Sequence, residues 1–191
     1  LGRQLDDRGY QAVVWPSIGF APSTDLASLE RFINNVDDQD LVVVGSQQVV
    51  AFDQALVSKL QQTEAEIYAI GKGTAQALTD KGINVTGYPM PGGSDTLLEL
   101  DAFHDLTGKT VWLLRAQSGR ELLTRALPSR GAIVMPTTCY QRIDHTDFDP
   151  RLVAPYNLII ATSVTCLENL VSALGDQRTV LQNIPITVIG Q

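Results

Sequence analysis

The sequence predicts an α/β protein with two doubly wound parallel-sheet lobes that come from an internal duplication and are joined by a two-stranded connector. Two observations carry this prediction. Blocks of residues from the first part of the chain recur in the same order later in the chain. Short, continuous apolar runs alternate with helical stretches, as expected for parallel strands that helices cover on both faces.

The repeat consists of three blocks at nearly one offset. The blocks and their copies are 1–9 and 123–131 (offset 122), 40–46 and 157–163 (offset 117), and 67–71 and 186–190 (offset 119). This spacing is far longer than that of a solenoid repeat, so each copy should form about one small domain. Two such lobes are expected to enclose a ligand-binding cleft.

The two copies differ in completeness. Copy two opens with the apolar run 111–114, which has no counterpart in copy one because Leu1 already lies within the matching helix. Copy one continues past Gly71 into a helix, whereas copy two stops at Gln191. We therefore expect a fragment that lacks a strand at its front and at least a helix at its back.

The apolar runs and helical stretches define the expected elements. The predicted strands, in chain order, are 12–15, 41–44, 67–70, 83–86, 111–114, 133–135, 158–161 and 186–189. The predicted helices are 25–34, 49–60, 74–81, 95–103, 119–127 and 166–174. The expected N-caps are Ser23 or Thr24, Ser94 and Ser118, because their side-chain oxygens can accept hydrogen bonds from the first free N–H groups of a helix.

Two extended segments interrupt the alternation of strands and helices. Segments 15–22 and 135–142 follow equivalent strands of the two copies and contain prolines. Proline favours extended backbone at itself and at the residue before it. We interpret these segments as two crossings between the lobes, so that one lobe is inserted into the other. The expected first lobe is 1–16 plus 142–191, incomplete at both ends, and the inserted lobe is 18–140.

The composition excludes several classes of protein. With 191 residues, 44% of them hydrophobic, the chain can bury one large core or two small ones. No apolar run approaches the ~20 residues that span a bilayer, so no membrane partner is expected. The net charge of −7 argues against nucleic acid as a partner. Cys139 and Cys166 lack metal-ligand spacing, and we expect buried thiols and a reducing cytoplasm. The chain is also expected to be a monomer.

One region departs from the acidic character of the chain. Between Gly108 and Arg142, Glu121 is the only acidic residue. The basic residues of this region are Lys109, Arg115, Arg120, Arg125, Arg130 and Arg142. Any one of them alone is best explained as part of a solvated helix face or an ion pair. Together they could hold an anionic small molecule, and Arg115 and Arg120 are the candidates for binding it.

The common catalytic signatures are absent from the sequence. It contains no His/Cys metal spacing, no P-loop, no Gly-x-Ser-x-Gly elbow and no complete Gly-x-Gly-x-x-Gly fingerprint. His104 and His145 are expected at the surface. No metal site is therefore expected.

Strand-to-helix turns that are rich in glycine and small hydroxyl residues remain as candidate binding sites. Such turns lie at the carboxyl ends of parallel strands, where the N–H groups of a helix start can hold carboxylates or phosphates. The candidate residues are Ser46, Gln47, Gly71, Lys72, Gly73, Thr74, Ser163, Val164 and Gly190. For Ser46, Thr74 and Ser163 a plain helix-capping role is an equally good interpretation.

Tyr140 is a candidate of another kind, because it lies in the second expected crossing. A phenol beside a cleft can donate a hydrogen bond or act as a general acid. The alternative is a tyrosine that is simply packed into the hinge.

Several segments together indicate a family. They are 70–78 with Lys81 and Gly82, 114–122, 130–142, the turns at Ser46 and at Thr162–Ser163, and Trp15–Pro16. Each motif is loose, but their order and spacing are specific and extend over nearly the whole chain. In this arrangement the sequence resembles the uroporphyrinogen-III synthase family.

The resemblance implies two α/β lobes with a two-stranded connector and a lyase that needs no cofactor. Such an enzyme closes the linear tetrapyrrole hydroxymethylbilane and inverts its last ring, by loss of the terminal hydroxyl, attack of ring D on the resulting azafulvene, and a spiro intermediate. Tyr140 would then assist departure of the hydroxyl, and Ser46, Thr74 and Ser163 would line the cleft.

The sequence departs from the family pattern at two points. Gly45 stands where the first Thr-Ser turn usually has Thr, so this side of the cleft would bind mostly through backbone groups. The threonine that follows the last glycine in the family falls beyond Gln191, which argues against activity of the fragment alone.

Two other classes of function compete with the synthase. A non-catalytic two-lobed binding module of the sensor or periplasmic-binding type would share the duplicated α/β body and the hinge, but it would release its ligand unchanged. A receiver-type signalling domain would need acidic residues at the strand ends, where this chain carries Gly, Ser, Thr and Arg.

Overall fold

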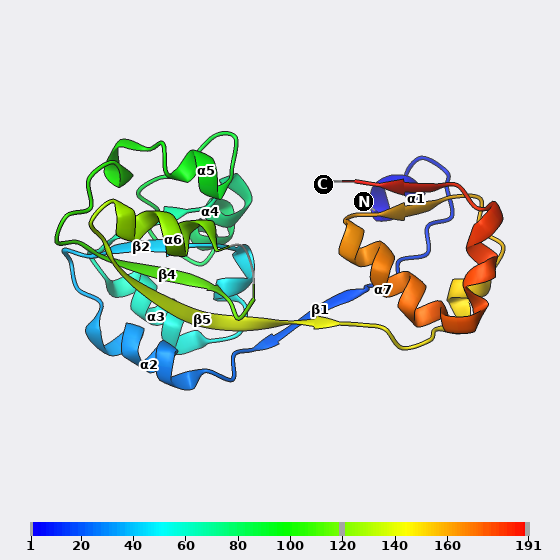
Figure 1. Cartoon of the computed structure of the whole chain (residues 1–191), viewed down its shortest axis with the longest axis horizontal. Helices are drawn as coiled ribbons and strands as arrows, with labels where there is room; N and C mark the ends of the chain where they lie inside the picture. The colour runs from blue at the N-terminus through cyan, green and yellow to red at the C-terminus, as the bar shows by residue number, and fades with distance from the viewer. Residues whose placement is uncertain (1, 119–120, 190–191) are drawn as a thin grey trace. The chain divides into compact units, whose positions relative to one another are not determined.

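The chain folds into two units in a computed structural model that describes residues 2–118 and 121–189 (Figure 1). Unit 1 consists of Leu1–Gly19 and Ile143–Gln191, and unit 2 consists of Phe20–Arg142. Strands β1 (Ile18–Pro22) and β5 (Ile133–Asp144) each begin in one unit and end in the other. The backbone N–H of His145 donates to the Ser17 carbonyl at 2.9 Å beside these strands.

A mostly parallel sheet forms the centre of unit 2. Its strand order is β1-β5-β4-β2-β3, with β2 (Leu41–Val44), β3 (Glu66–Ala69) and β4 (Thr110–Ala116). The pairs β2–β3, β2–β4 and β4–β5 are all parallel. Because β1 enters unit 2 and β5 leaves it, these two neighbours run in opposite directions (Figure 1). The predicted α/β class with a mostly parallel sheet is confirmed.

Helices cover both faces of this sheet. One buried cluster joins the sheet to α2 (Leu26–Asn35), α3 (Gln54–Gln62) and α4 (Lys72–Thr79), and the other joins it to α5 (Ser94–Leu97) and α6 (Leu122–Ser129). The whole of β2 is buried as a result. Continuous apolar strands are stable in this position because both of their faces are removed from water.

Capping side chains set the starts of the helices on the first face. Asp25 accepts a hydrogen bond from the Ser28 N–H at 3.1 Å and begins α2, so the prediction of Ser23 or Thr24 as the cap was wrong. Asp53 accepts from the Leu56 N–H at 2.8 Å and begins α3. The single helix predicted at 49–60 is therefore split into the 3-10 helix η1 (Gln47–Val50) and α3.

The second face also differs in detail from the prediction. The helix expected at 95–103 is divided into α5 and the 3-10 helix η2 (Asp101–Phe103), and Gly93 rather than Ser94 is the N-cap. Helix α6 has Glu121 as its N-cap, so Ser118 does not have that role. Short helices with poor caps depend on burial, which Leu97 and Phe103 provide at 0% exposure.

Two of the predicted strands are not strands in the structure. Segment 12–15 has no regular structure, and Val13 and Val14 are 53% and 64% exposed. Segment 83–86 contributes a backbone hydrogen bond from Thr86 to Ile67, and next to it Gly87 forms an isolated bridge to Tyr68. A short apolar run becomes a strand only where a neighbour supplies a full set of hydrogen bonds.

Unit 1 is smaller. It contains α1 (Gly2–Asp6), η3 (Pro150–Val153), β6 (Ile159–Ala161), α7 (Val164–Leu174), η4 (Gly175–Asn183) and β7 (Ile186–Val188). In the residues that the structure describes, its sheet is the parallel pair β6–β7. A doubly wound sheet in this lobe stays a prediction.

A buried amide holds the parts of unit 1 together. The side-chain N–H of Asn169 on α7 donates to the Ser17 carbonyl at 2.8 Å and to the Asp144 carboxylate at 3.0 Å. These bonds join residues far apart in the chain to one helix. Over residues 2–118 and 121–189, no helix is long and apolar enough to cross a membrane.

Candidate functional site

A pocket of about 510 Å³ opens at the carboxyl ends of β2 and β3 in unit 2. Three segments line it: the turn after β2, the turn after β3 with the start of α4, and the loop 88–93. The lining residues are Gly45, Ser46, Gln47, Ile70, Gly71, Lys72, Gly73, Thr74, Gly92 and Gly93. The structure thus brings the predicted binding residues of 46–47 and 71–74 to one surface.

The position of this pocket in the sheet is related to the strand order. From β2 the chain goes to β3 on one side of β2 and then returns to β4 on the other side. In open α/β sheets, ligands bind beyond the carboxyl ends of the strands, near the point where the order reverses. The reversal lies between β2 and β4, and the turn after β2 borders both that point and the pocket. The Gly45 N–H donates to the Leu114 carbonyl at 2.9 Å, which fixes the turn after β2 against the end of β4.

Helix α4 begins at the pocket without a side-chain cap. Its N-cap is Gly71, which has no side-chain acceptor, and the N–H of Ala75 donates to the Gly71 carbonyl at 3.0 Å. The N–H groups of Lys72, Gly73 and Thr74 therefore have no acceptor within the helix. Free N–H groups at the positive end of the helix dipole favour an anionic ligand.

Thr74 adds a second donor to the same place. The residue lines the pocket although it is only 7% exposed. Its hydroxyl makes no hydrogen bond to any of residues 2–118 and 121–189. The oxygen of this hydroxyl is not enclosed by protein, so the group is available to a ligand in the pocket.

The other two hydroxyls of the predicted turns have capping partners. Ser46 accepts from the Gln48 N–H at 3.2 Å at the start of η1, and Ser163 accepts from the Cys166 N–H at 3.2 Å at the start of α7. The capping interpretation therefore describes Ser46 and Ser163 but not Thr74. The Ser46 hydroxyl accepts a bond in its cap and still has its own proton to donate.

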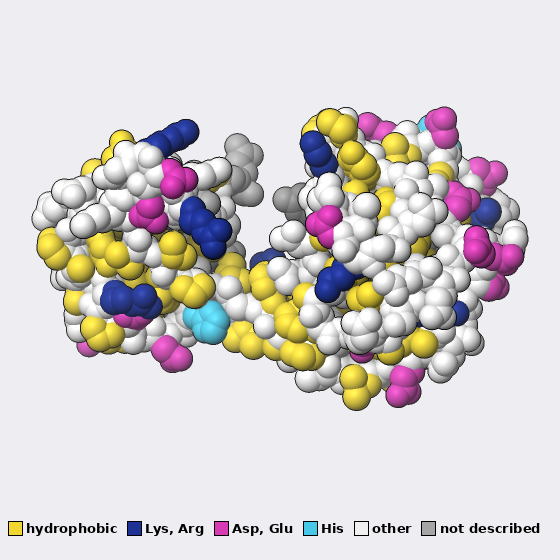
Figure 2. Space-filling model, turned by 180° about the vertical axis from the view of Figure 1, so that it is seen from behind, with side chains coloured by type: hydrophobic (Ala, Val, Ile, Leu, Met, Phe, Trp, Pro, Cys, Tyr) yellow, Lys and Arg dark blue, Asp and Glu magenta, His cyan; other side chains and the backbone are white. Residues whose placement is uncertain are grey.

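The charge of the pocket favours an anion. None of its ten lining residues is acidic, and the exposed Lys72 adds a positive charge. Five of the ten are glycines, so a ligand can reach the backbone N–H groups closely. Figure 2 shows acidic and basic side chains interspersed over the face that it draws, so the acid-free pocket differs from that general surface.

Arg115 lies at the end of β4 and is half-buried. Its guanidinium donates to the Thr124 hydroxyl at 3.1 Å and to the Ala116 carbonyl at 3.3 Å. It is adjacent to the Gly45 turn but is not among the residues that line the pocket. Two further candidates, Arg120 and Gly190, lie outside the described residues.

Tyr140 is packed into the core of unit 2. It is 5% exposed, and its ring meets the Phe20 ring edge to face with centroids 5.7 Å apart. Its hydroxyl makes no hydrogen bond within 2–118 and 121–189. The structure thus shows a packed tyrosine whose hydroxyl is uncommitted, and the predicted catalytic role stays a prediction.

Ser163 and Val164 begin α7 in unit 1, where Val164 is 52% exposed. The Ser163 hydroxyl also donates to the Cys166 sulfur at 3.2 Å. Partial burial raises the pKa of the Cys166 thiol, but hydrogen bonds from Ser163, Ser17 and Thr162 outweigh that effect and lower the pKa overall. The expectation of a buried Cys166 was wrong, because this thiol is half-buried.

Sequence reasoning missed the third wall of the pocket. Gly92 and Gly93 line it, although the segment that contains them reads only as a loop. The pair of adjacent glycines was the available signal, since glycine often marks a close approach of two backbones.

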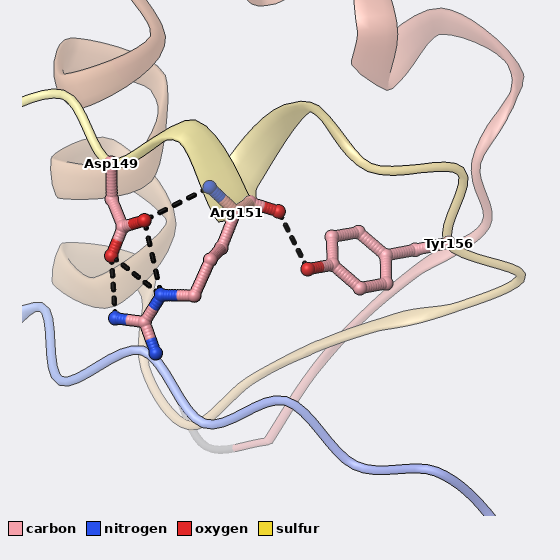
Figure 3. Close-up of polar contacts among 3 residues, drawn as sticks. All are labelled: Asp149, Arg151 and Tyr156. Carbon is pink, nitrogen blue, oxygen red and sulfur yellow. Dashed lines mark hydrogen bonds and ion pairs between the residues drawn. The ribbon is translucent and has the colours of Figure 1, made fainter.

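A smaller hollow of about 310 Å³ lies in unit 1, beside η3. Arg151 lines it, but its guanidinium is paired with the Asp149 carboxylate at 2.5 Å, and the Tyr156 hydroxyl donates to the Arg151 carbonyl at 2.6 Å (Figure 3). Acidic, basic and apolar residues alternate around this hollow, and they define no ligand class. In the described part of the chain, no group of three or more His, Cys, Asp or Glu residues could hold a metal ion.

Comparison with known proteins identifies the family. The family model described as uroporphyrinogen-III synthase HemD matches residues 1–191. The chain belongs to the uroporphyrinogen-III synthase family. This assignment gives no support to the alternative of a non-catalytic sensor-type module.

Curated members of the uroporphyrinogen-III synthase family align with most of the chain. The uroporphyrinogen-III synthase of Proteus mirabilis is 34% identical over 147 residues, which cover 75% of this chain and 74% of that protein. The synthase of Escherichia coli is 35% identical over 149 residues. That alignment covers 74% of this chain but only 59% of the Escherichia coli protein.

Solved structures of uroporphyrinogen III synthases share the fold. A mutant synthase from Thermus thermophilus matches with a TM-score of 0.60 and 16% identity, over 98% of this chain and 78% of that one. The enzyme from Helicobacter pylori matches with a TM-score of 0.55 and 16% identity, over 94% and 89% of the two chains. At this level of identity the likeness concerns the α/β fold alone.

Proposed function

We propose that the protein containing this chain is a uroporphyrinogen-III synthase, a cyclising lyase of tetrapyrrole and haem biosynthesis. Its substrate would be hydroxymethylbilane, a linear tetrapyrrole rich in carboxylates, and its product the type III isomer with ring D inverted. The observation that carries this proposal is the uncapped start of α4 with the uncommitted hydroxyl of Thr74 on an acid-free pocket. This is a site for carboxylates in a chain of the synthase family.

The proposed reaction proceeds without a cofactor. The terminal hydroxyl leaves as water and gives an azafulvene, the substituted carbon of ring D attacks it, and the spiro intermediate fragments and closes as the type III ring. The unaided substrate closes to the type I isomer, so the enzyme has to impose one conformation. Fixed N–H groups that hold the carboxylates would keep the substrate in this conformation.

The roles of the candidate residues follow from this chemistry. Gly71, Lys72, Gly73 and Thr74 would hold one carboxylate-bearing ring, with Ser46 and Gln47 across the pocket. Further contacts are proposed for Arg115, Arg120, Ser163, Val164 and Gly190. Tyr140 would donate its proton to the departing hydroxyl, for which its uncommitted phenol is suited.

We also propose that the two units are duplicated lobes, and the ends of α1 and α6 support this. At the end of α1, the Leu5 carbonyl accepts hydrogen bonds from the N–H groups of Arg8, at 3.0 Å, and Tyr10, at 3.1 Å. At the end of α6, 122 residues later, the Leu127 carbonyl accepts in the same way from the N–H groups of Arg130, at 3.0 Å, and Ala132, at 3.2 Å. In both turns the helix ends before a left-handed glycine, with φ of 83° at Gly9 and 91° at Gly131.

A cytoplasmic monomer is the corresponding proposal for compartment and assembly. Cys139 and Cys166 are both free, as in a reducing compartment. The pocket is formed within unit 2 of a single chain, so the proposed binding of one ring needs no second copy.

The product ratio tests the function. The purified full-length protein that contains this chain is supplied with freshly prepared hydroxymethylbilane, and the type III and type I products are separated after oxidation to porphyrins. We expect type III to predominate, and Thr74→Val to raise KM about fivefold because one hydrogen bond is lost. Thr74→Ser, which retains the hydroxyl, is the matched control. Only type I product at the uncatalysed rate would refute the proposal.

Tyr140→Phe tests the acid role separately. Loss of a general acid lowers turnover by roughly 10²- to 10⁴-fold, whereas a packing role leaves turnover near that of the wild type. The measurement is kcat for type III formation, with the melting temperature as a check of folding. Unchanged turnover and isomer ratio would remove Tyr140 from the mechanism.

A further inference from the structure

The loop 88–93 is anchored to the end of β3 at both of its ends. The Gly93 N–H donates to the Ile70 carbonyl at 2.9 Å, and the Ala69 N–H donates to the Gly87 carbonyl at 3.0 Å. Between these bonds the loop exposes Met90 at 77% and turns back to the pocket at Gly92. Its backbone is therefore fixed to the same strand that leads into α4.

Gly71 and Gly92 pack backbone against backbone at the pocket. A Cβ on Gly92 would lie 3.0 Å from the Gly71 Cα and 3.3 Å from the Ile70 carbonyl oxygen. A Cβ on Gly71 would lie 3.1 Å from the Gly92 Cα. Gly71 has φ of 174°, which any residue adopts, so the need for glycine comes from this close approach.

Thr96 holds the loop in this position from outside the pocket. Its hydroxyl donates to the Pro91 carbonyl at 2.7 Å, and the Gly93 carbonyl is 3.2 Å away. Thr96 does not line the pocket. Its hydroxyl therefore acts on the pocket only through residues 91–93.

We propose that Gly92 and Thr96 are positioning residues for the substrate, because they fix the loop 88–93 against Gly71, beside the free N–H groups of α4. The Gly71–Gly92 contact sets how closely this loop approaches the start of α4, and the hydrogen bond from the Thr96 hydroxyl to the Pro91 carbonyl holds the loop in that position. A carboxylate-bearing pyrrole ring would enter between this loop and Thr74. This inference rests on the proposed function, since it concerns binding of the same substrate.

Variants at Gly92, Thr96 and Gly87 test this positioning role. Gly92→Ala forces the loop away from Gly71, and we expect KM for hydroxymethylbilane to rise roughly ten- to a hundredfold, since small displacements of a positioning wall have effects of this size. Thr96→Val should raise KM about fivefold, and Thr96→Ser should restore it. Gly87→Ala is the matched control, because its Cβ would meet the Tyr68 ring at an ordinary 3.4 Å, away from the pocket.

The readouts separate positioning from stability and from the function itself. For each variant KM, kcat, the isomer ratio and the melting temperature are measured. A raised KM in a protein that melts like the wild type supports the role, and wild-type KM in folded Gly92→Ala and Thr96→Val overturns it. If Gly92→Ala does not fold, the Thr96→Val and Thr96→Ser pair decides. Type I product alone from the wild type refutes the proposed function, and the positioning role with it.

Discussion

The strand pairs β2–β3 and β6–β7 have the same register but different surroundings. Val42 pairs with Ile67 in unit 2, and at offsets of 117 and 119 Ile159 pairs with Ile186 in unit 1. Every residue of β2 is at most 2% exposed, whereas Ile186 and Val188 of β7 are 38% and 37% exposed. Similar segments therefore form the same strand pairing in both units, whereas the burial of a strand depends on the layers that cover it.

The largest expected difference between the two units is the loss of unfolding free energy when a core leucine is truncated. Leu56 on α3 is fully buried in the large core of unit 2, and Leu170 on α7 is 8% exposed within the smaller cluster of unit 1. Leu56→Ala should cost about 4 kcal/mol of unfolding free energy and Leu170→Ala about 2 kcal/mol, because a larger rigid core leaves a larger cavity. Equal losses would contradict the contrast between the units.

Each unit contains its own tryptophan, so fluorescence can follow the unfolding of each unit separately. Trp112 packs against Phe32 in unit 2, with ring centroids 5.4 Å apart, and Trp15 borders the buried cluster of unit 1. Urea unfolding is followed by fluorescence in Trp15→Phe and Trp112→Phe backgrounds, each of which leaves one reporter. A substitution should shift the transition of its own unit more than that of the other.

A smaller difference in stability is expected when the residues before β2 and β6 are substituted. Asp40 is 7% exposed and accepts a hydrogen bond from the Trp112 indole N–H at 2.7 Å, whereas its counterpart Asn157 is exposed. Asp40→Ala should cost about 1–3 kcal/mol, since it leaves the buried indole N–H unpaired. Asn157→Ala should change stability by less than about 0.5 kcal/mol. Similar effects in thermal unfolding would show that the two positions are equivalent.

The two cysteines provide the mildest test of the comparison. Burial raises the pKa of Cys139 in unit 2 to about 12, while the hydroxyls around Cys166 in unit 1 lower its pKa. Because the thiolate is the reactive form, alkylation of Cys166 should rise with pH and level off below the pH at which an ordinary cysteine does. Cys139 should react only after unfolding. Iodoacetamide labelling followed by mass spectrometry measures both rates.

Substitution around Cys166 sharpens this test. Thr162→Val removes one hydroxyl near the sulfur, at 3.4 Å, and should move the alkylation profile to higher pH. Labelling of Cys139 in the same sample is the internal control. An unchanged profile would assign the low pKa to the remaining hydroxyls alone.

The sequence was most informative where one segment determines its own structure. The run 41–44 is a strand because its residues are continuously apolar, and the repeat at 186–189 predicted β7. The sequence was less informative where a segment needs a partner that is distant in the chain to form its structure. Val13 and Val14 are apolar but form no strand, because no strand among residues 2–118 and 121–189 pairs with them.

The same distinction applies to the candidate site. Ser46 and Thr74 could be placed on one edge because the carboxyl ends of parallel strands meet there. Gly92 could not, because its place depends on two backbones that meet from segments 21 residues apart in the chain, at positions 71 and 92. The burial of Tyr140 was equally hidden, since it depends on Phe20 and the helices of unit 2.

The division of unit 1 between two stretches of chain has a consequence for biosynthesis. Unit 2 is continuous from Phe20 to Arg142, so all of it has been synthesised before Ile143 is added. At ~5–20 residues per second, these 123 residues (142 − 20 + 1) take roughly 6 to 25 seconds to translate. During that time Leu1–Gly19 has none of its partners from 143–191, while unit 2 can fold as soon as it has left the ribosome. The nascent chain therefore completes its binding pocket before it can assemble its smaller unit.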